Sequence, residues 1–131
     1  MQLKISTDYA IRIVLYLAAK RKSTTSNELA DSLGIPQSIV FKIGKELSDN
    51  GIISVSTGVY GGFLLKKKPE DIRLFDIINI FEPTIKLNRC LEEDRYCSRF
   101  ATESCSVRNF YCKLQQRFEN DLKNISIKEL L

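Results

Sequence analysis

Apolar residues recur with a helical period through the first part of the chain. Over residues 7–19 they include Ile11, Val14, Leu15 and Leu17. Spacings of three and four bring these side chains to one face of a helix, because an α-helix turns once every 3.6 residues, roughly. The pattern therefore predicts a first helix over 7–19 with a wide apolar face.

A short second helix and a tight turn are expected next. Ser26 is a good N-cap residue for a helix that carries Leu29 and Leu33 as its apolar edge, because its hydroxyl can accept from a free backbone N–H. Gly34 stands where a helix C-terminus favours a left-handed backbone. Pro36 cannot continue this helix but is well suited to open another. The pattern predicts helix, turn and helix in close succession.

The helix after Pro36 is amphipathic. Its apolar residues recur at spacings typical of one helical face: Ile39, Val40, Ile43 and Leu47. Its outward face keeps Gln37, Ser38, Phe41, Lys42, Lys45 and Glu46. Amide, hydroxyl and ammonium groups can hydrogen-bond base edges or phosphates, and an aromatic ring can contact a thymine methyl group. We therefore expect this helix to enter the major groove of DNA.

Two short apolar runs around glycines predict a β-hairpin. The first run spans 52–56 and the second 63–65, with Gly58, Gly61 and Gly62 between them. A hairpin after a helix-turn-helix is the winged-helix arrangement. The run 66–68 is three lysines, whose positive charge suits DNA phosphates.

Two further helices are expected beyond the hairpin, over 69–81 and 105–123. Residues 84–88 between them read as extended, and 90–104 as a loop, because that segment is rich in charges and has little periodicity. The apolar stripe of the last helix steps by four, three, four and four residues: Val107, Tyr111, Leu114, Phe118 and Leu122. This stripe is too long for a small domain to cover alone, and it resembles a heptad seam.

We expect the stripe to form a homodimer interface, which would match the two-fold symmetry of palindromic DNA sites. The alternative is that the last helix packs against the first helix of its own chain. The predicted fold class is mainly α: a winged helix-turn-helix with a long C-terminal dimerisation helix. The expected division is a DNA-binding domain over 1–83, a cysteine-bearing loop over 84–104, and the dimerisation helix with a C-terminal turn over 105–131.

Length and composition agree with a single small protein. A chain of 131 residues that is 44% hydrophobic can bury a core, and its net charge of +4 is mild. No apolar run approaches the length of a membrane span, and the N-terminus lacks a signal-peptide pattern. We therefore expect a cytoplasmic protein with double-stranded DNA, and no membrane, as its partner.

Four cysteines and no histidine narrow the possible chemistry. Without histidine the chain cannot build a Ser-His-Asp or Cys-His catalytic group, so we expect no enzyme. Cysteine clusters in the cytoplasm more often bind metal or sense redox state than form disulfides. Cys112 follows Cys105 by seven residues, roughly 10 Å along a helix, and is best interpreted as a buried structural thiol.

Several segments together resemble one bacterial family. They are Asp8-Tyr9-Ala10, the wing sequence 56–65, residues 72–81, the three loop cysteines and the ending 124–130. In these the chain resembles the Rrf-type winged-helix regulators, which include iron–sulfur-sensing repressors of cluster biogenesis and nitric-oxide-sensing repressors. The Gly-Gly-aromatic-x-Leu wing and the C-terminal ending are the most specific parts.

The resemblance implies a 2Fe–2S or 4Fe–4S cluster on Cys90, Cys97 and Cys105. Asp8 stands where the nitric-oxide-sensing branch has an aspartate, and it or an outside group is the fourth ligand. The gaps between the cysteines are six and seven residues, where the family usually has five and five. Arg108 occupies the histidine position of the biogenesis branch and cannot ligate metal. The expected DNA-contact residues are Ser26, Gln37, Ser38, Phe41, Lys42, Lys45, Thr57, Gly58, Tyr60 and Lys66.

The expected function is that of a dimeric, sequence-specific repressor whose affinity for DNA is set by an iron–sulfur cluster. A cluster-free regulator that responds to thiol oxidation or to a ligand is an alternative. Zinc is a further alternative for the cysteines, although structural zinc favours ligand pairs two to four residues apart, roughly. A small iron–sulfur electron carrier and a protein-binding winged helix are the other classes, and both leave the outward face of residues 37–46 without a DNA-reading role.

Overall fold

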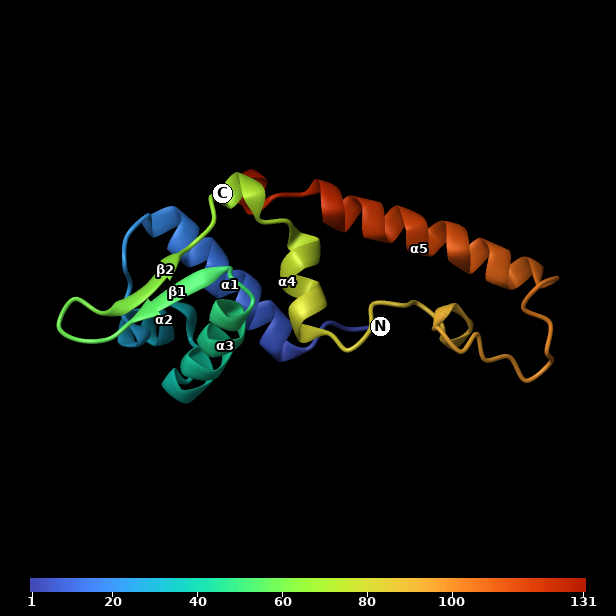
Figure 1. Cartoon of the computed structure of the whole chain (residues 1–131), viewed down its shortest axis with the longest axis horizontal. Coiled ribbons are helices and arrows are strands. Elements are labelled where there is room, and N and C mark those ends of the chain that lie inside the picture. The colour runs from blue at the N-terminus through green and yellow to red at the C-terminus, as the bar shows by residue number, and fades with distance from the viewer.

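The computed structural model describes all residues, 1–131, and confirms a mainly helical winged helix-turn-helix with a long final helix (Figure 1). The regular elements are α1 (Ile5–Lys20), α2 (Ser26–Leu33), α3 (Gln37–Asp49), β1 (Ile53–Ser56), β2 (Gly62–Leu65), α4 (Leu74–Phe81) and α5 (Ser106–Asn124). Three short 3₁₀ turns lie at Pro69–Asp71, Arg89–Leu91 and Ile127–Leu130. None of these helices could serve as a membrane span.

The helix-turn-helix is formed by α2 and α3. Gly34 takes the expected left-handed conformation at the end of α2, with φ of 65°. The predicted N-cap was wrong by one residue, because the hydroxyl of Thr25, not that of Ser26, accepts from the Glu28 N–H at 3.1 Å. Ser26 is instead the first helical residue, and its hydroxyl is free to contact the next helix.

The wing is an antiparallel pair in which Ile53 lies opposite Leu65 and Val55 opposite Phe63. Thr24 adds a short third edge, because its N–H donates to the Phe63 carbonyl at 2.9 Å and its carbonyl accepts from the Phe63 N–H at 2.8 Å. The segment before α2 is therefore fastened to β2. At the tip of the hairpin Gly58 has a φ of 101°, a conformation that favours glycine.

The core of the domain is centred on α1. Buried apolar side chains from all five helices but α5, from the wing and from the C-terminal turn form one cluster, which includes Ala10, Ile13, Val14, Leu17, Leu29, Val40, Ile43, Leu47, Ile53, Phe63, Ile72, Ile77 and Ile127. The predicted inward residues of α3 are confirmed at Val40, Ile43 and Leu47, while Ile39 is half-buried. This packing leaves the opposite side of α3 facing solvent.

The helix predicted over 69–81 is shorter than expected. Residues 69–71 form a separate 3₁₀ turn, and α4 begins at Leu74. The reason is tertiary: the Ile127 N–H donates to the Ile72 carbonyl at 2.9 Å, and the Leu74 N–H donates to the Ile125 carbonyl at 3.0 Å. These two bonds hold the chain extended before α4 and attach the C-terminal tail to it.

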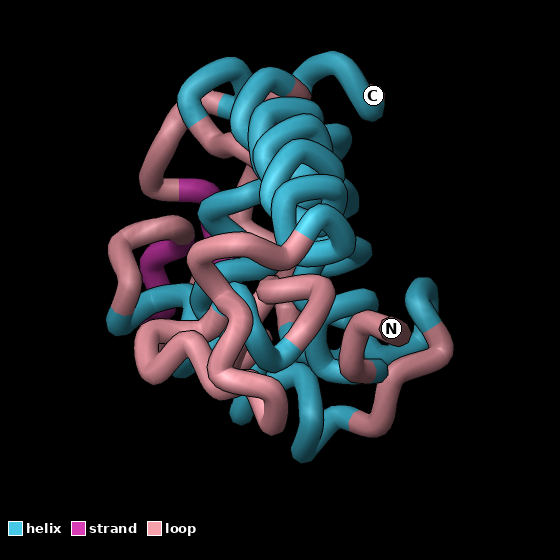
Figure 2. Tube along the Cα trace, turned by 90° about the vertical axis from the view of Figure 1, so that its right-hand side faces the viewer, coloured by secondary structure: helices cyan, strands magenta, loops and turns pink.

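The long helix α5 begins beside the cysteine loop and runs back to the body of the molecule (Figure 1). Figure 2 looks nearly along this helix, with the loop segments beside it. Its predicted bounds were right to within about a turn, and Cys105 is the residue that caps it. Within the chain α5 packs mainly against α4 and the Arg89–Leu91 turn. The division at 83/84 and 104/105 stays a prediction.

Candidate nucleic-acid interface and cysteine loop

The outward face of α3 is open to solvent. Its exposed residues are those expected from the pattern: Gln37, Ser38, Phe41, Lys42 and Lys45. Glu46, also expected there, is half-buried. Lys45 is held by an ion pair to Asp49 at 2.9 Å on the same helix, whereas Lys42 makes no ion pair within the chain. The Lys42 ammonium group is therefore available to an external partner.

Gln37 connects the N-termini of α2 and α3. Its side-chain amide donates to the Ser26 hydroxyl at 2.9 Å, and the pair is exposed. Both helices begin at this point, so their free backbone N–H groups share one surface. Such a surface suits a phosphate oxygen, which gives Ser26 a location consistent with its expected role.

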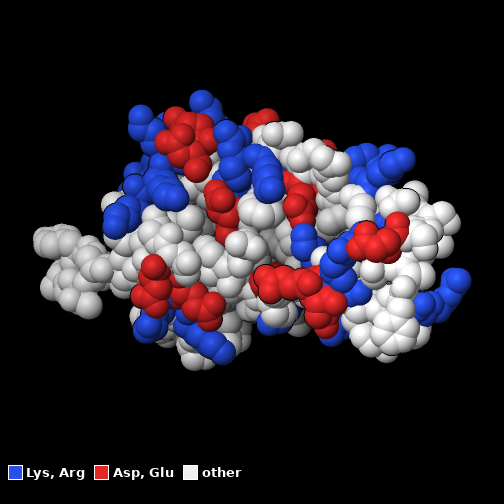
Figure 3. All heavy atoms as spheres, turned by 45° about the vertical axis from the view of Figure 1, so that its right-hand side comes forward, with Lys and Arg blue, Asp and Glu red and all other residues white.

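The tip of the wing is uncharged and projects from the body. In Figure 3 it is the projection at the left that carries no blue or red atoms. Val59 and Tyr60 are each 94% exposed, and Thr57 and Gly58 beside them are exposed as well. Lys66 is exposed at the base of the wing. The wing therefore has an uncharged tip, and its positive charge lies where β2 returns to the body.

Three of the four cysteines line one hollow at the N-terminus of α5. All four are free thiols and half-buried. The hollow has a volume of ≈ 360 Å³, and its lining includes Cys90, Cys97, Cys105, Arg108, Tyr96 and Tyr111. Cys112 lies about two turns beyond Cys105 along α5 and does not line the hollow. The predicted separation of Cys112 from the loop cysteines agrees with this arrangement.

Polar contacts fix the walls of this hollow. The Arg108 guanidinium donates to the Cys90 carbonyl at 3.1 Å, and the Asn88 amide donates to the Cys90 thiol at 3.2 Å. The Cys105 thiol accepts from the Arg108 backbone N–H at 3.4 Å, which caps α5. Hydrogen bonds from the backbone N–H groups of Ala101 and Arg99 hold the pKa of Cys97 below its ordinary value. Arg108, which cannot ligate metal, therefore supports the cysteine loop through the Cys90 carbonyl.

Asp8 lies outside this hollow in the same chain. It is in the first turn of α1, where it pairs with Arg12 at 2.6 Å. No group of three cysteine or carboxylate side chains in one chain is close enough to hold a single metal ion. The three cysteines are thus gathered around one hollow, but their thiols do not converge on one point.

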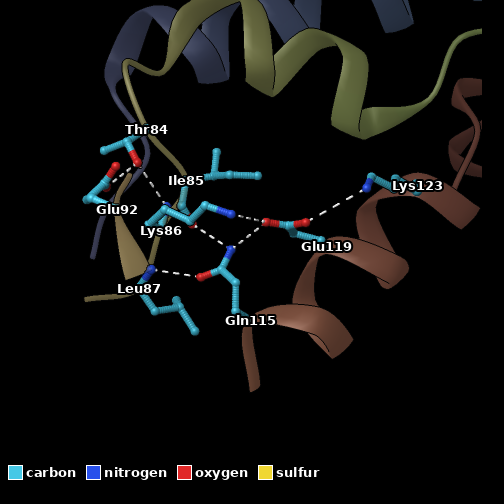
Figure 4. A network of polar contacts seen from close by, with 8 residues as sticks. All are labelled: Thr84, Ile85, Lys86, Leu87, Glu92, Gln115, Glu119 and Lys123. Atoms are coloured by element: carbon cyan, nitrogen blue, oxygen red, sulfur yellow. Dashed lines mark hydrogen bonds and ion pairs between the residues drawn. The ribbon is translucent and has the colours of Figure 1, made fainter. Parts of the chain in front are cut away.

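Sequence reasoning missed a polar contact network centred on Gln115 (Figure 4). This residue of α5 is 6% exposed; its carbonyl oxygen accepts from the Leu87 N–H at 2.8 Å and its amide donates to the Ile85 carbonyl at 3.0 Å. The amide also donates to Glu119 at 2.9 Å, and Lys86 pairs with Glu119 at 3.1 Å. Desolvation raises the pKa of Glu119, but these hydrogen bonds outweigh it and leave the pKa below its ordinary value.

This network attaches the segment that leads from α4 to the cysteine loop onto α5. The only sequence signal was that a glutamine follows Leu114, a residue of the apolar stripe, and this signal does not identify a partner for the glutamine. Gln115 accepts from one backbone N–H and donates to one backbone carbonyl of the segment 85–87, as a neighbouring β-strand would.

An apolar groove lies between α4, α5 and the N-terminal segment. Its volume is ≈ 470 Å³, and its apolar lining includes Leu3, Ile11, Leu74, Ile78, Leu114, Phe118 and Leu122. We call it the α4–α5 groove. Three residues of the predicted dimer stripe lie in it, whereas Val107, nearer the cysteine loop, is 53% exposed.

The winged helix-turn-helix with an open recognition helix places the chain in a fold class that is typical of DNA-binding proteins. The chain belongs to the Rrf2 family, whose model, described as "Iron-dependent Transcriptional regulator", matches residues 3–131. A relative from Aquifex aeolicus (strain VF5), described as an HTH-type transcriptional regulator, is 33% identical over 124 residues, which cover 94% of this chain and 86% of that protein. The resemblance seen in the sequence is thereby confirmed.

Two solved structures share the fold. CymR (YrzC), the global cysteine regulator of B. subtilis, superposes with a TM-score of 0.83 at 20% identity, over 99% of this chain and 95% of that one. T. potens IscR superposes with a TM-score of 0.77 at 17% identity, over 99% of this chain and 85% of that one. At this identity the likeness establishes the fold.

Proposed function

We propose that this regulator reads a specific DNA sequence with the outward face of α3. The observation that carries the proposal is the set of exposed polar, aromatic and cationic side chains on that face of α3. The opposite face of the helix is buried in the core through Val40, Ile43 and Leu47. Gln37, Ser38, Phe41, Lys42 and Lys45 would contact the major groove, and Ser26 and Lys66 the phosphates. Thr57, Gly58 and Tyr60 would place the wing on the flanking DNA.

Selection from a pool of random duplexes tests this proposal. The wild-type protein is expected to enrich one sequence motif, with binding that weakens as salt is raised. A pool that stays unenriched, while the protein remains folded, would overturn sequence-specific reading. The enriched duplex, called here the selected duplex, then serves in every binding experiment below.

Tyr60→Ser is expected to weaken binding to the selected duplex about tenfold and to leave its salt dependence unchanged. The reason is that an exposed aromatic ring at the wing tip contributes contact with DNA but releases no counterion. The measurement is the slope of log K against log salt concentration. Lys66→Ala is the control, because loss of one phosphate contact should reduce that slope by about one. An affinity for Tyr60→Ser equal to that of the wild type would contradict the assignment.

We further propose that the α4–α5 groove is covered by a second copy of the chain. Leu114, Phe118 and Leu122 supply its α5 side, and the exposed Val107 and half-buried Tyr111 continue the stripe beyond it. A two-fold dimer would present two copies of α3 to the two halves of a palindromic site. A single-chain mass in solution, at concentrations where DNA is bound, would overturn this part of the proposal.

For the cysteine loop we propose an iron–sulfur cluster held by Cys90, Cys97 and Cys105. The donor set fits, since thiolates are the usual ligands of such clusters and three of them surround one hollow. The fourth ligand would be Asp8 of the second copy or an outside group. When bound, the cluster supplies a redox-sensitive link between the loop and its ligands. The chain itself would transmit the state of the cluster along α5 to the proposed dimer interface. The hollow lies at the N-terminus of α5, and the α4–α5 groove lies toward its C-terminus.

Reconstitution with iron and sulfide under anaerobic conditions tests the cluster. The wild-type protein and Cys112→Ser are expected to become coloured and to retain iron, whereas Cys97→Ser is expected to lose the chromophore. A protein that stays colourless without bound iron would overturn the cluster proposal. The free thiols around one hollow then favour a second candidate, a thiol switch, for which mild oxidation should give an intramolecular disulfide detected by mass spectrometry.

A further inference from the structure

Phe63 of the wing is buried and attached on two sides. It is 2% exposed, and its backbone exchanges two hydrogen bonds with Thr24, the residue that precedes the α2 cap. Its side chain points away from these bonds and toward α3. One residue of β2 thus contacts both the start of the helix-turn-helix and the recognition helix.

Gly44 of α3 makes room for the Phe63 ring. It is buried near the middle of the helix, and its φ is not positive, so the backbone does not require glycine there. A Cβ at Gly44 would lie only 2.3 Å from Cε1 of Phe63 and 3.1 Å from Cδ1. Glycine in a helix interior is less favourable than alanine. The close approach of the wing to α3 is what the missing side chain permits.

Phe41 rests on the same ring from the outward side. The centroids of Phe41 and Phe63 are 6.1 Å apart and the rings are tilted by 52°, a common geometry for aromatic pairs. Phe41 is 53% exposed, on the face that would meet DNA. Since Phe41 and Gly44 are three residues apart, they are neighbours on one side of α3.

We propose that Phe63 is a positioning residue for DNA recognition. Seated against Gly44, it fixes the wing relative to α3 and supports the Phe41 ring in the orientation that contacts bases. The major-groove and wing contacts then act as one rigid reading unit. This inference rests on the proposed reading of DNA by α3.

The test compares affinities for the selected duplex and for a random-sequence duplex at one salt concentration. Phe63→Leu is expected to lower the affinity for the selected duplex about three- to tenfold, the value of one aromatic pair. Its affinity for the random duplex should change less than about twofold, because phosphate contacts remain. Phe81→Leu, a buried phenylalanine of α4, is the matched control and should lower Tm without changing the ratio of the two affinities.

A double-mutant cycle isolates the link to Phe41. Adding Phe63→Leu to Phe41→Ala should cause a smaller loss on the selected duplex than Phe63→Leu causes alone, because the ring that Phe63 supports is already absent. Additive losses would overturn the proposal, and so would equal losses on both duplexes, which indicate a structural role alone. If the wild-type protein selects no duplex, the proposed function fails instead, so the two failures are distinguishable.

The close contact has its own test, by rescue. Gly44→Ala is expected to lower Tm and the affinity for the selected duplex, because the added methyl group meets the Phe63 ring. The combined variant Gly44→Ala, Phe63→Leu should regain Tm, since the shorter side chain vacates that space, while its affinity stays at the level of Phe63→Leu. A Tm of the combined variant no higher than that of Gly44→Ala would overturn the assigned contact.

Discussion

Replacing Phe41 and Lys42 together by alanine is expected to weaken binding to the selected duplex by about a hundredfold or more. Each good base contact contributes about 1–3 kcal/mol of discrimination, and this variant removes one aromatic and one cationic candidate from the centre of α3. Both side chains are exposed and neither is needed by the core. Electrophoretic mobility shifts with the selected duplex measure the loss.

Lys113→Ala is the matched control for this variant. Lys113 is exposed on α5 and, like Lys42, forms no ion pair within the chain, so its loss removes the same charge far from α3. It should leave the affinity nearly unchanged. Both variants should keep the circular dichroism spectrum and solution mass of the wild type. Affinity retained in the double variant would show that α3 is not the reading element.

Gln115→Leu is expected to lower the free energy of unfolding by about 2–4 kcal/mol. Leucine fits the volume but leaves the Leu87 N–H and the Ile85 carbonyl without their partners, and an unsatisfied buried polar group costs about 1–3 kcal/mol. Urea unfolding at one fixed protein concentration measures the change, because association would also affect stability. Gln116→Leu, on the exposed side of the same helix, should change the free energy by less than about 0.5 kcal/mol.

An unfolding free energy for Gln115→Leu equal to that of Gln116→Leu would show that the segment 85–87 is held by other contacts. The two variants introduce the same side chain one residue apart, so the change in helix propensity cancels in the comparison. What remains is the difference between a buried hydrogen-bonding amide and an exposed one.

Features encoded by local pattern could be predicted from the sequence. The turn after Leu33 requires a left-handed residue and Gly34 supplies it, so the helix-turn-helix was found correctly. The expected C-terminal turn was also found, and it opens with a capping box in which the Ser126 N–H donates to Glu129 at 2.7 Å. In each case the deciding residues lie within one turn of one another.

Features set by distant partners could not be predicted. The start of α4 depends on bonds from Ile72 to Ile127, residues that the pattern treats separately. Gln115 pairs with a segment 28 residues earlier, and nothing at either position identifies the other. Gly44 gave no signal either, since a glycine in a helix interior reads only as an unfavourable residue until the Phe63 ring is seen against it.

The candidate cysteine site falls between these cases. The lack of periodicity placed Cys90 and Cys97 correctly in the segment before α5, and Cys105 is the N-cap of that helix, one residue before its first turn. Whether their thiols can meet depends on the path of the loop and on a second chain, neither of which spacing determines. The same holds for Asp8, whose only partner in its own chain is Arg12.

The attachment of the tail to α4 turns α5 into a lever. The helix is anchored near Asn124, whose carbonyl accepts from the Arg73 guanidinium at 3.2 Å, and its other end projects toward the cysteines. Nineteen residues at a rise of about 1.5 Å each give a span of about 28 Å, so a tilt of about 5° at the anchor would displace the far end by about 2.5 Å. Because Gln115 holds the segment 85–87 against α5, a small change in the tilt of α5 would move both ends of the cysteine loop together.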